Sequence, residues 1–163
     1  MTRLLRYLGF AMLGYFALTF WPEGWPRPDP LLLALAQLAW RRASPARCAA
    51  LGVLGGLGMS LIGPGLSGVF VAVYGWTGLL LGLAGEGEAR EGPLVPALMV
   101  TAGTLVVGLG LAGLGHWLEL GPSPDRVKSW LPGAVVLNLA FWFGLLRPAP
   151  VRERRVRVRA AAS

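Results

Sequence analysis

Residues able to do chemistry are few in this 163-residue chain, and they are scattered. It has one cysteine, Cys48, and one histidine, His116, which excludes an internal disulfide and any site built from several histidines. The long apolar runs carry hydroxyl and amide side chains but no carboxylate pair and no Ser, His and Asp set. These polar residues are Thr19, Gln37, Ser60, Ser67, Thr77, Thr101, Thr104 and Asn138. We therefore predict hydrogen bonding within a packed structure, with no enzymatic activity, no cofactor and no metal site.

Asn138 is the strongest hydrogen-bonding group expected at depth, in the middle of the last apolar run. Its amide either bonds a neighbouring helix or makes a contact needed to recognise a partner. Ser60 is a weaker candidate, because a serine can satisfy its hydroxyl on its own helix. His116 precedes Trp117 near the end of a run, where it is either an interfacial anchor or a ligand or proton carrier.

The composition excludes an ordinary soluble domain. Hydrophobic residues make up 55% of the chain, glycine adds 24 residues, and only 14% of residues are charged, against about 25% in soluble domains. The mean hydropathy is +0.59. A formal net charge of +7 does not indicate a nucleic-acid partner, because much of the positive charge follows the last apolar run. Long uncharged runs indicate an all-α integral membrane protein.

Six transmembrane helices are expected in one domain, residues 1–147, followed by a basic tail, residues 148–163. The second and third helices are expected to be short. Asp29 is suited to cap the second helix, and Pro30 fits its first turn. The proline-rich stretch that begins at Pro22 predicts an aqueous turn before this helix. At about 13 residues the second helix spans only ~20 Å, so it needs a partner helix, a tilt or a thinner bilayer to cross a ~30 Å core. The expected helices are 4–21, 28–40, 47–62, 66–84, 93–117 and 129–146.

Basic residues indicate the orientation. With both termini cytoplasmic, twelve of the fifteen basic residues lie inside, and Arg27, Arg126 and Lys128 lie outside. The tail supplies half of the twelve, and its arginines are expected to contact anionic lipid, at about 1 kcal/mol each, or else a cytoplasmic partner. They are Arg147, Arg152, Arg154, Arg155, Arg157 and Arg159.

Glycines are dense in the third and fourth helices. Gly52 and Gly56 have the four-residue spacing that lets two helix backbones approach closely in a bilayer. This spacing allows two interpretations. The glycines either pack helices of this chain against each other or bind a transmembrane helix of another protein.

Two stretches resemble the MreD family of rod shape-determining proteins. The first is Arg27-Pro28-Asp29-Pro30 before a run of leucines, and the second is the glycine-rich stretch 52–68, in which we single out Gly63, Pro64, Gly65 and Gly68. Asn138 matches a family asparagine. The chain departs from the family where Ser60 replaces an acid, Leu79 a tyrosine and Phe143 a proline.

The resemblance implies a non-enzymatic inner-membrane scaffold of the bacterial elongation machinery. Its expected partners are MreC and, through the complex, the class B penicillin-binding protein and RodA, in support of peptidoglycan synthesis and rod shape. It also implies a fold similar to the substrate-binding subunits of energy-coupling-factor vitamin transporters.

The alternative function is such a transporter subunit, which needs an outward cavity with convergent polar groups. The sequence disfavours it, because few polar residues are expected beneath the outer tryptophans. An intramembrane enzyme is a third reading, for which the sequence offers no residues.

Overall fold

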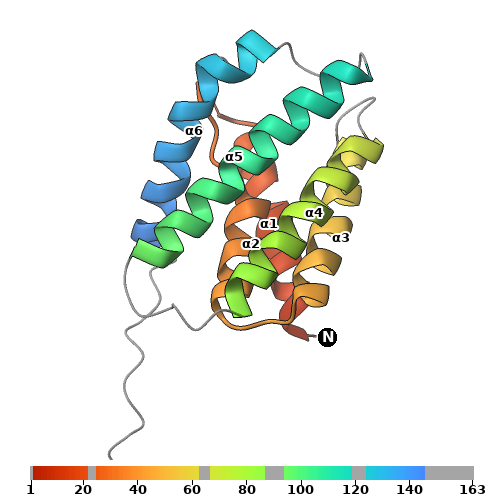
Figure 1. Ribbon diagram of the computed structural model, residues 1–163, viewed down its shortest axis with the longest axis vertical. Helices are drawn as coiled ribbons and strands as arrows, with labels where there is room; N and C mark the ends of the chain where they lie inside the picture. The colour runs from red at the N-terminus through yellow and green to blue at the C-terminus, as the bar shows by residue number, and fades with distance from the viewer. Residues whose placement is uncertain (1, 22–24, 63–66, 87–93, 119–123, 146–163) are drawn as a thin grey trace, which may run out of the picture.

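The computed structural model describes residues 2–21, 25–62, 67–86, 94–118 and 124–145. All regular secondary structure in this described part is helical, as the composition predicted, and it comprises six helices (Figure 1). In chain order they are α1 (Thr2–Leu18), α2 (Pro30–Trp40), α3 (Pro45–Ile62), α4 (Ser67–Glu86), α5 (Leu94–Trp117) and α6 (Pro124–Leu145).

The helix bounds differ from expectation by a few residues, most at the start of α6, and the length of α3 also differs. Residues 124–128 were expected in a loop but form the first turn of α6, where Pro124 and Asp125 suit a helix N-terminus. α3 was expected to be short and has 18 residues, or about 27 Å. It is shorter than α4, α5 and α6, but only α2, with 11 residues, is markedly short.

α2 is the centre of the bundle. Its residues from Pro30 to Ala39 are all buried, and it contacts α1, α3, α4 and α5. A helix that is apolar on every side is stable only when other helices surround it. The short helix is therefore enclosed by longer neighbours, which corresponds to one of the three expectations for it, partner helices.

Both ends of α2 are capped. Asp29 caps the start, as predicted, because its side chain accepts a hydrogen bond from the backbone N–H of Leu32 at 3.0 Å. At the other end Arg42 has a φ of 59°, and the N–H of Ala43 donates to the carbonyl of Leu38 at 3.2 Å. This is a Schellman motif with arginine in the left-handed position that glycine usually takes.

Glycines let the neighbours close on α2. A side chain at Gly14 of α1 would meet Pro30 at 2.6 Å, and one at Gly103 of α5 would meet Leu32 at 2.6 Å. Gly55 of α3 lies in the same way against Leu31. Pro30, Leu31 and Leu32, the first three residues of α2, thus each contact a glycine of a different helix.

The glycine spacing in α3 and α4 serves internal packing. A Cβ at Gly56 would lie 2.7 Å from the carbonyl oxygen of Phe70, and Gly52 faces the carbonyl of Tyr74. In return Gly78 of α4 faces the carbonyl of Cys48, and Gly82 faces Pro45. These two helices make the most extensive contact in the bundle. The sequence left open whether these glycines pack against a helix of this chain or receive a helix from another protein. In the structure Gly52 and Gly56 pack against α4 of the same chain.

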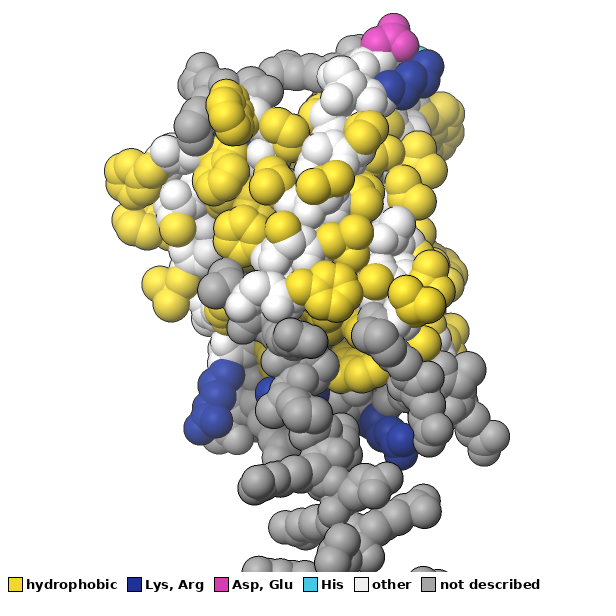
Figure 2. Space-filling view, turned by 90° about the vertical axis from the view of Figure 1, so that its left-hand side faces the viewer, with side chains coloured by type: hydrophobic (Ala, Val, Ile, Leu, Met, Phe, Trp, Pro, Cys, Tyr) yellow, Lys and Arg dark blue, Asp and Glu magenta, His cyan; other side chains and the backbone are white. Residues whose placement is uncertain are grey.

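The outer surface of the bundle is apolar between two polar ends. Figure 2 shows hydrophobic side chains covering the middle of one face, with the charged side chains confined to its ends. Leu61 and Phe20 are 89% and 80% exposed. α4 and α5 are long and apolar enough to cross a membrane. Soluble monomers rarely expose continuous apolar surface of this extent.

Replacing Gly56 with leucine should separate α3 from α4, because the new side chain would meet backbone that cannot move aside. We expect Gly56→Leu to lower stability by about 1–3 kcal/mol or more. The measurement is unfolding of the purified chain in detergent.

Gly113→Leu is the matched control, since Gly113 is an exposed helical glycine and a Cβ added to it would meet nothing within 4 Å. Equal stability of the two variants would contradict the internal packing of Gly56.

Candidate functional site

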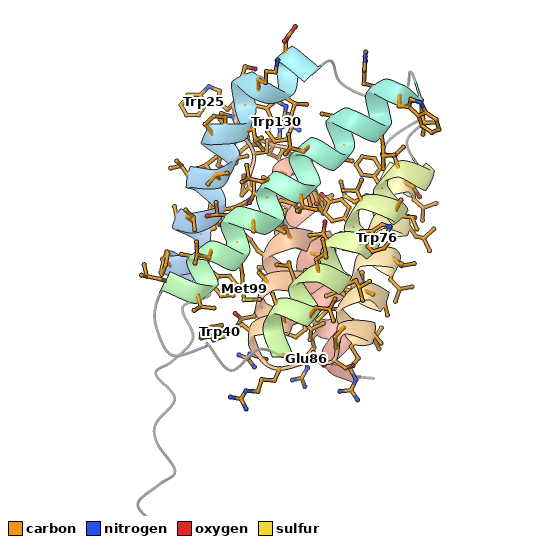
Figure 3. All side chains as sticks on the ribbon, in the orientation of Figure 1. Trp25, Trp40, Trp76, Glu86, Met99 and Trp130 are labelled. Carbon is orange, nitrogen blue, oxygen red and sulfur yellow. The ribbon has the colours of Figure 1, made fainter. Side chains whose placement is uncertain are left out.

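An extended segment, residues 25–29, leads into α2 from one end of the bundle, with Trp25 and Arg27 exposed and Asp29 partly buried. α2 is about 16 Å long at its 11 residues, so Asp29 lies roughly halfway across a ~30 Å apolar layer when Trp40 is near its edge. Figure 3 shows Trp25 and Trp130 near one end of the bundle and Trp40 near the other. The sequence predicted an aqueous turn here; the segment is non-helical and exposes Trp25 and Arg27, while Asp29 lies further in, where it bonds Tyr15 and Tyr74.

Buried backbone groups need hydrogen-bond partners from the protein or from ordered water. Prolines at 26 and 28 remove two N–H donors from the segment, and Pro30 removes a third at the start of α2. The N–H of Asp29 donates to Oδ1 of Asn138 at 2.7 Å. The carbonyl of Pro26 accepts from Nε1 of Trp21 at 3.0 Å. Side chains thus pair the N–H of Asp29 and the carbonyl of Pro26, and the prolines reduce the number of donors that need a partner.

The Asp29 carboxylate joins three helices. Tyr15 of α1 donates its hydroxyl to Oδ1 at 2.6 Å, and Tyr74 of α4 donates to Oδ2 at 2.6 Å. Oδ1 also accepts the capping bond from Leu32 of α2. The two tyrosine hydroxyls lie 3.2 Å apart. Hydrogen bonds to a carboxylate are short and strong, and 2.6 Å is within their usual range.

Asn138 extends these contacts to α5 and α6. While its Oδ1 accepts from Asp29, its Nδ2 donates to Oγ1 of Thr104 at 3.0 Å. Thr104 in turn donates to the carbonyl of Val100 at 2.8 Å. Asn138 and Thr104 are 1% and 3% exposed. The amide oxygen and the amide nitrogen of Asn138 each have a hydrogen-bond partner, and an unpaired polar atom at such a buried position would be costly.

We call these five side chains the Asp29 network. Its members come from α1, the start of α2, α4, α5 and α6, and each polar group has a partner within the network or on the backbone. They are Tyr15, Asp29, Tyr74, Thr104 and Asn138.

A cavity of about 630 Å³ lies above the network. The network forms its floor, apolar side chains such as Phe70, Val107 and Leu111 form its walls, and Trp25, Arg27 and Trp130 lie at its rim. Its volume is within the range of small-molecule sites, about 300–1,000 Å³. The expectation that few polar groups lie beneath the outer tryptophans is therefore wrong.

The structure brings together only some of the predicted site residues. Asp29 and Asn138 meet, and Pro28 is buried on the cavity wall. Gly52 and Gly56 lie instead between α3 and α4. Ser60 donates to the carbonyl of Leu57 at 2.6 Å, which confirms that it satisfies itself on its own helix.

The remaining predicted positions are not part of the network. Gly68 is exposed and faces open space. Gly63, Pro64, Gly65 and the six tail arginines lie outside the described residues. His116 is exposed in the last turn of α5, at a polar end of the bundle.

Sequence reasoning missed Tyr15 and Tyr74. A usable signal existed, because the chain has only three tyrosines and both of these interrupt apolar runs. A buried tyrosine hydroxyl usually needs a partner, and the nearby acids offered few choices. What the sequence did not show is that Asp29 lies deep enough to be that partner.

The site has the character of a structural junction with a cavity above it. The Asp29 carboxylate is held by three donors, and no second carboxylate accompanies it among the five network residues. Searches of protein families, curated proteins and solved structures return no match to this chain.

Replacing Asp29 with alanine should destabilise the bundle, because it removes the α2 cap and leaves the hydroxyls of Tyr15 and Tyr74 without their acceptor. We expect a loss of about 2–4 kcal/mol for Asp29→Ala. Asp29→Asn should lose less, since an amide oxygen can still accept the capping bond. Unfolding of the purified chain in detergent measures both.

Asp125→Ala provides the control, because Asp125 is exposed in the first turn of α6 and its side-chain partner among the described residues is Lys128, at 3.3 Å in an exposed pair. The stabilising role of the network would be disproved by an Asp29→Ala variant as stable as Asp125→Ala.

Proposed function

We propose that this chain is a six-span, non-enzymatic scaffold subunit of the bacterial elongation complex, of the MreD type. In this proposal it lies in the inner membrane with both termini cytoplasmic. It holds the transmembrane helix of MreC and, through the complex, positions the class B penicillin-binding protein and RodA.

The observation that carries the proposal is the bond between Asp29 and Asn138. The family resemblance singled out these two positions from separate stretches of sequence, 109 residues apart. The structure joins them at 2.7 Å, at the centre of the bundle. The two positions come from separate stretches of the resemblance and meet in the folded chain. Their contact supports membership of the MreD family better than either stretch does alone.

The charge distribution supports the proposed orientation. Arg41, Arg42 and Arg47 are exposed at the end of the bundle where Trp40 and Glu86 lie (Figure 3). The described N-terminus is at the same end (Figure 1). A cytoplasmic position for this end agrees with the positive-inside rule. The tail arginines would then face the anionic lipids of the inner leaflet.

α6 offers the open face for a partner helix. Among helix pairs with extended contact, α6 packs on α5 alone. Its buried side carries Ala134, Asn138 and Trp142, while Ala140 and Gly144 are exposed on the opposite side. Small residues four positions apart let a second helix approach closely. We propose this α6 face as the contact for MreC, in place of the α3 and α4 glycines.

The cavity favours a second candidate, the substrate-binding subunit of a vitamin transporter. Its volume and its polar floor suit a ligand site. Against this reading, the floor groups already hydrogen-bond one another, so they offer few free partners to a polar vitamin. We therefore favour the scaffold function over the transporter function.

The test is co-expression of the tagged chain with MreC and the class B penicillin-binding protein of the same genome, followed by detergent purification. We expect all three to be recovered together in fixed ratio, dependent on the partners' transmembrane helices. Recovery of the chain with a transporter ATPase module instead would refute the scaffold proposal and favour the transporter reading.

Ala140→Trp should weaken capture of MreC about tenfold, equivalent to ~1.4 kcal/mol, because the bulky side chain covers the small-residue face of α6. Ala72→Trp is the matched control, at an exposed alanine of α4 on the other side of the bundle (Figure 1). Each variant is first checked for unchanged unfolding in detergent. Equal capture by both variants would exclude the α6 face as the contact.

A further inference from the structure

We infer that the cavity above the Asp29 network binds an anionic lipid, with a hydrocarbon chain inside and a phosphate headgroup on Arg27. This inference goes beyond the proposed function and does not depend on it. It rests on three features of the cavity: its floor, its walls and its rim.

The floor offers little to a polar ligand. Both oxygens of Asp29 accept tyrosine hydroxyls, and Oδ1 also accepts the N–H of Leu32. Asn138 is bonded through both its oxygen and its nitrogen. A molecule that reaches the floor therefore gains little by hydrogen bonding, and a polar one would lose its own bonds to water.

The walls suit hydrocarbon. Leu18, Met59, Phe70, Val107 and Leu111 line the cavity between the floor and the rim. A flexible apolar chain makes dispersion contacts along such walls without needing any polar partner. The part of the ligand inside the cavity is therefore apolar.

The rim carries a single basic residue among the cavity-lining residues. Arg27 is exposed there, and no ion pair involves it among the described residues. Trp25 and Trp130 flank the same opening, and tryptophan is enriched at the level of lipid headgroups. The guanidinium group matches phosphate oxygens in a two-pronged geometry. An amphiphile with an anionic head and an apolar chain fits both the rim and the walls.

The experiment counts lipids bound to the full-length chain by native mass spectrometry from a nonionic detergent. Dioleoyl phosphatidylglycerol is compared with dioleoyl phosphatidylcholine, which carries the same chains on a zwitterionic headgroup. We expect one phosphatidylglycerol per chain, bound at least about tenfold more tightly than phosphatidylcholine. Equal binding of the two lipids would overturn recognition of the anionic headgroup.

Two variants test the contributions of the lipid headgroup and of its hydrocarbon chain separately. Arg27→Gln should reduce phosphatidylglycerol binding to the level of phosphatidylcholine. Leu111→Trp should reduce the binding of both lipids, because it fills the cavity, and its folding is checked by unfolding in detergent. Retention of the bound lipid by a folded Leu111→Trp chain would place the lipid elsewhere and overturn the inference.

Two controls exclude simpler explanations. Lys128→Gln removes an exposed positive charge outside the cavity, and it should leave binding unchanged. A loss equal to that of Arg27→Gln would mean general attraction to the surface. Inorganic phosphate at millimolar concentration should not displace the lipid, and displacement would mean a site for free phosphate. Failure of these tests leaves the MreC co-purification unaffected, so the two proposals are judged separately.

Discussion

The structure depends on starting a helix in the middle of an apolar bundle. A helix N-terminus presents backbone donors that water normally satisfies, and none can be left unpaired at this depth without a large cost. Asp29 meets this constraint by capping α2 through Leu32. The same carboxylate then has to be stabilised, and Tyr15 and Tyr74 supply the donors. One requirement of backbone chemistry therefore fixes how α1, α2 and α4 meet.

The glycine content follows from the same arrangement. α2 is buried on every side, and its neighbours must come close to cover 11 residues of apolar surface. Gly14, Gly55 and Gly103 provide that approach at the first three residues of α2. α3 and α4 pack through a second set of glycines, backbone against backbone. In a bilayer, where apolar side chains gain nothing by leaving lipid, such close packing is a main source of helix association.

Much of the fold could be predicted from the sequence, because helix boundaries are local. Apolar runs and prolines located all six helices to within a few residues, and Asp29 with Pro30 marked the α2 cap. The site was harder, because depth is not a local property. Prolines and an acid between two apolar runs are typical of an aqueous turn, and only the tertiary arrangement shows that this segment ends with Asp29 bonded to Tyr15 and Tyr74. Glycine spacing likewise predicted close contact for Gly52 and Gly56 without saying which helix would make it.

The proposed partner face and the proposed lipid site share one helix. α6 is joined to the bundle by its packing on α5 and by the bonds of Asn138 to Asp29 and Thr104. Its inner side lines the cavity through Ala134 and Asn138, while its outer side carries Ala140 and Gly144. A lipid in the cavity would support α6 from within, in the position from which it presents that outer side. If both proposals hold, each ligand changes the affinity for the other by the same factor, because coupling between two binding sites is reciprocal. The bonds of Asn138 to Asp29 and Thr104 join the cavity side of α6 to the rest of the bundle in the described part of the chain.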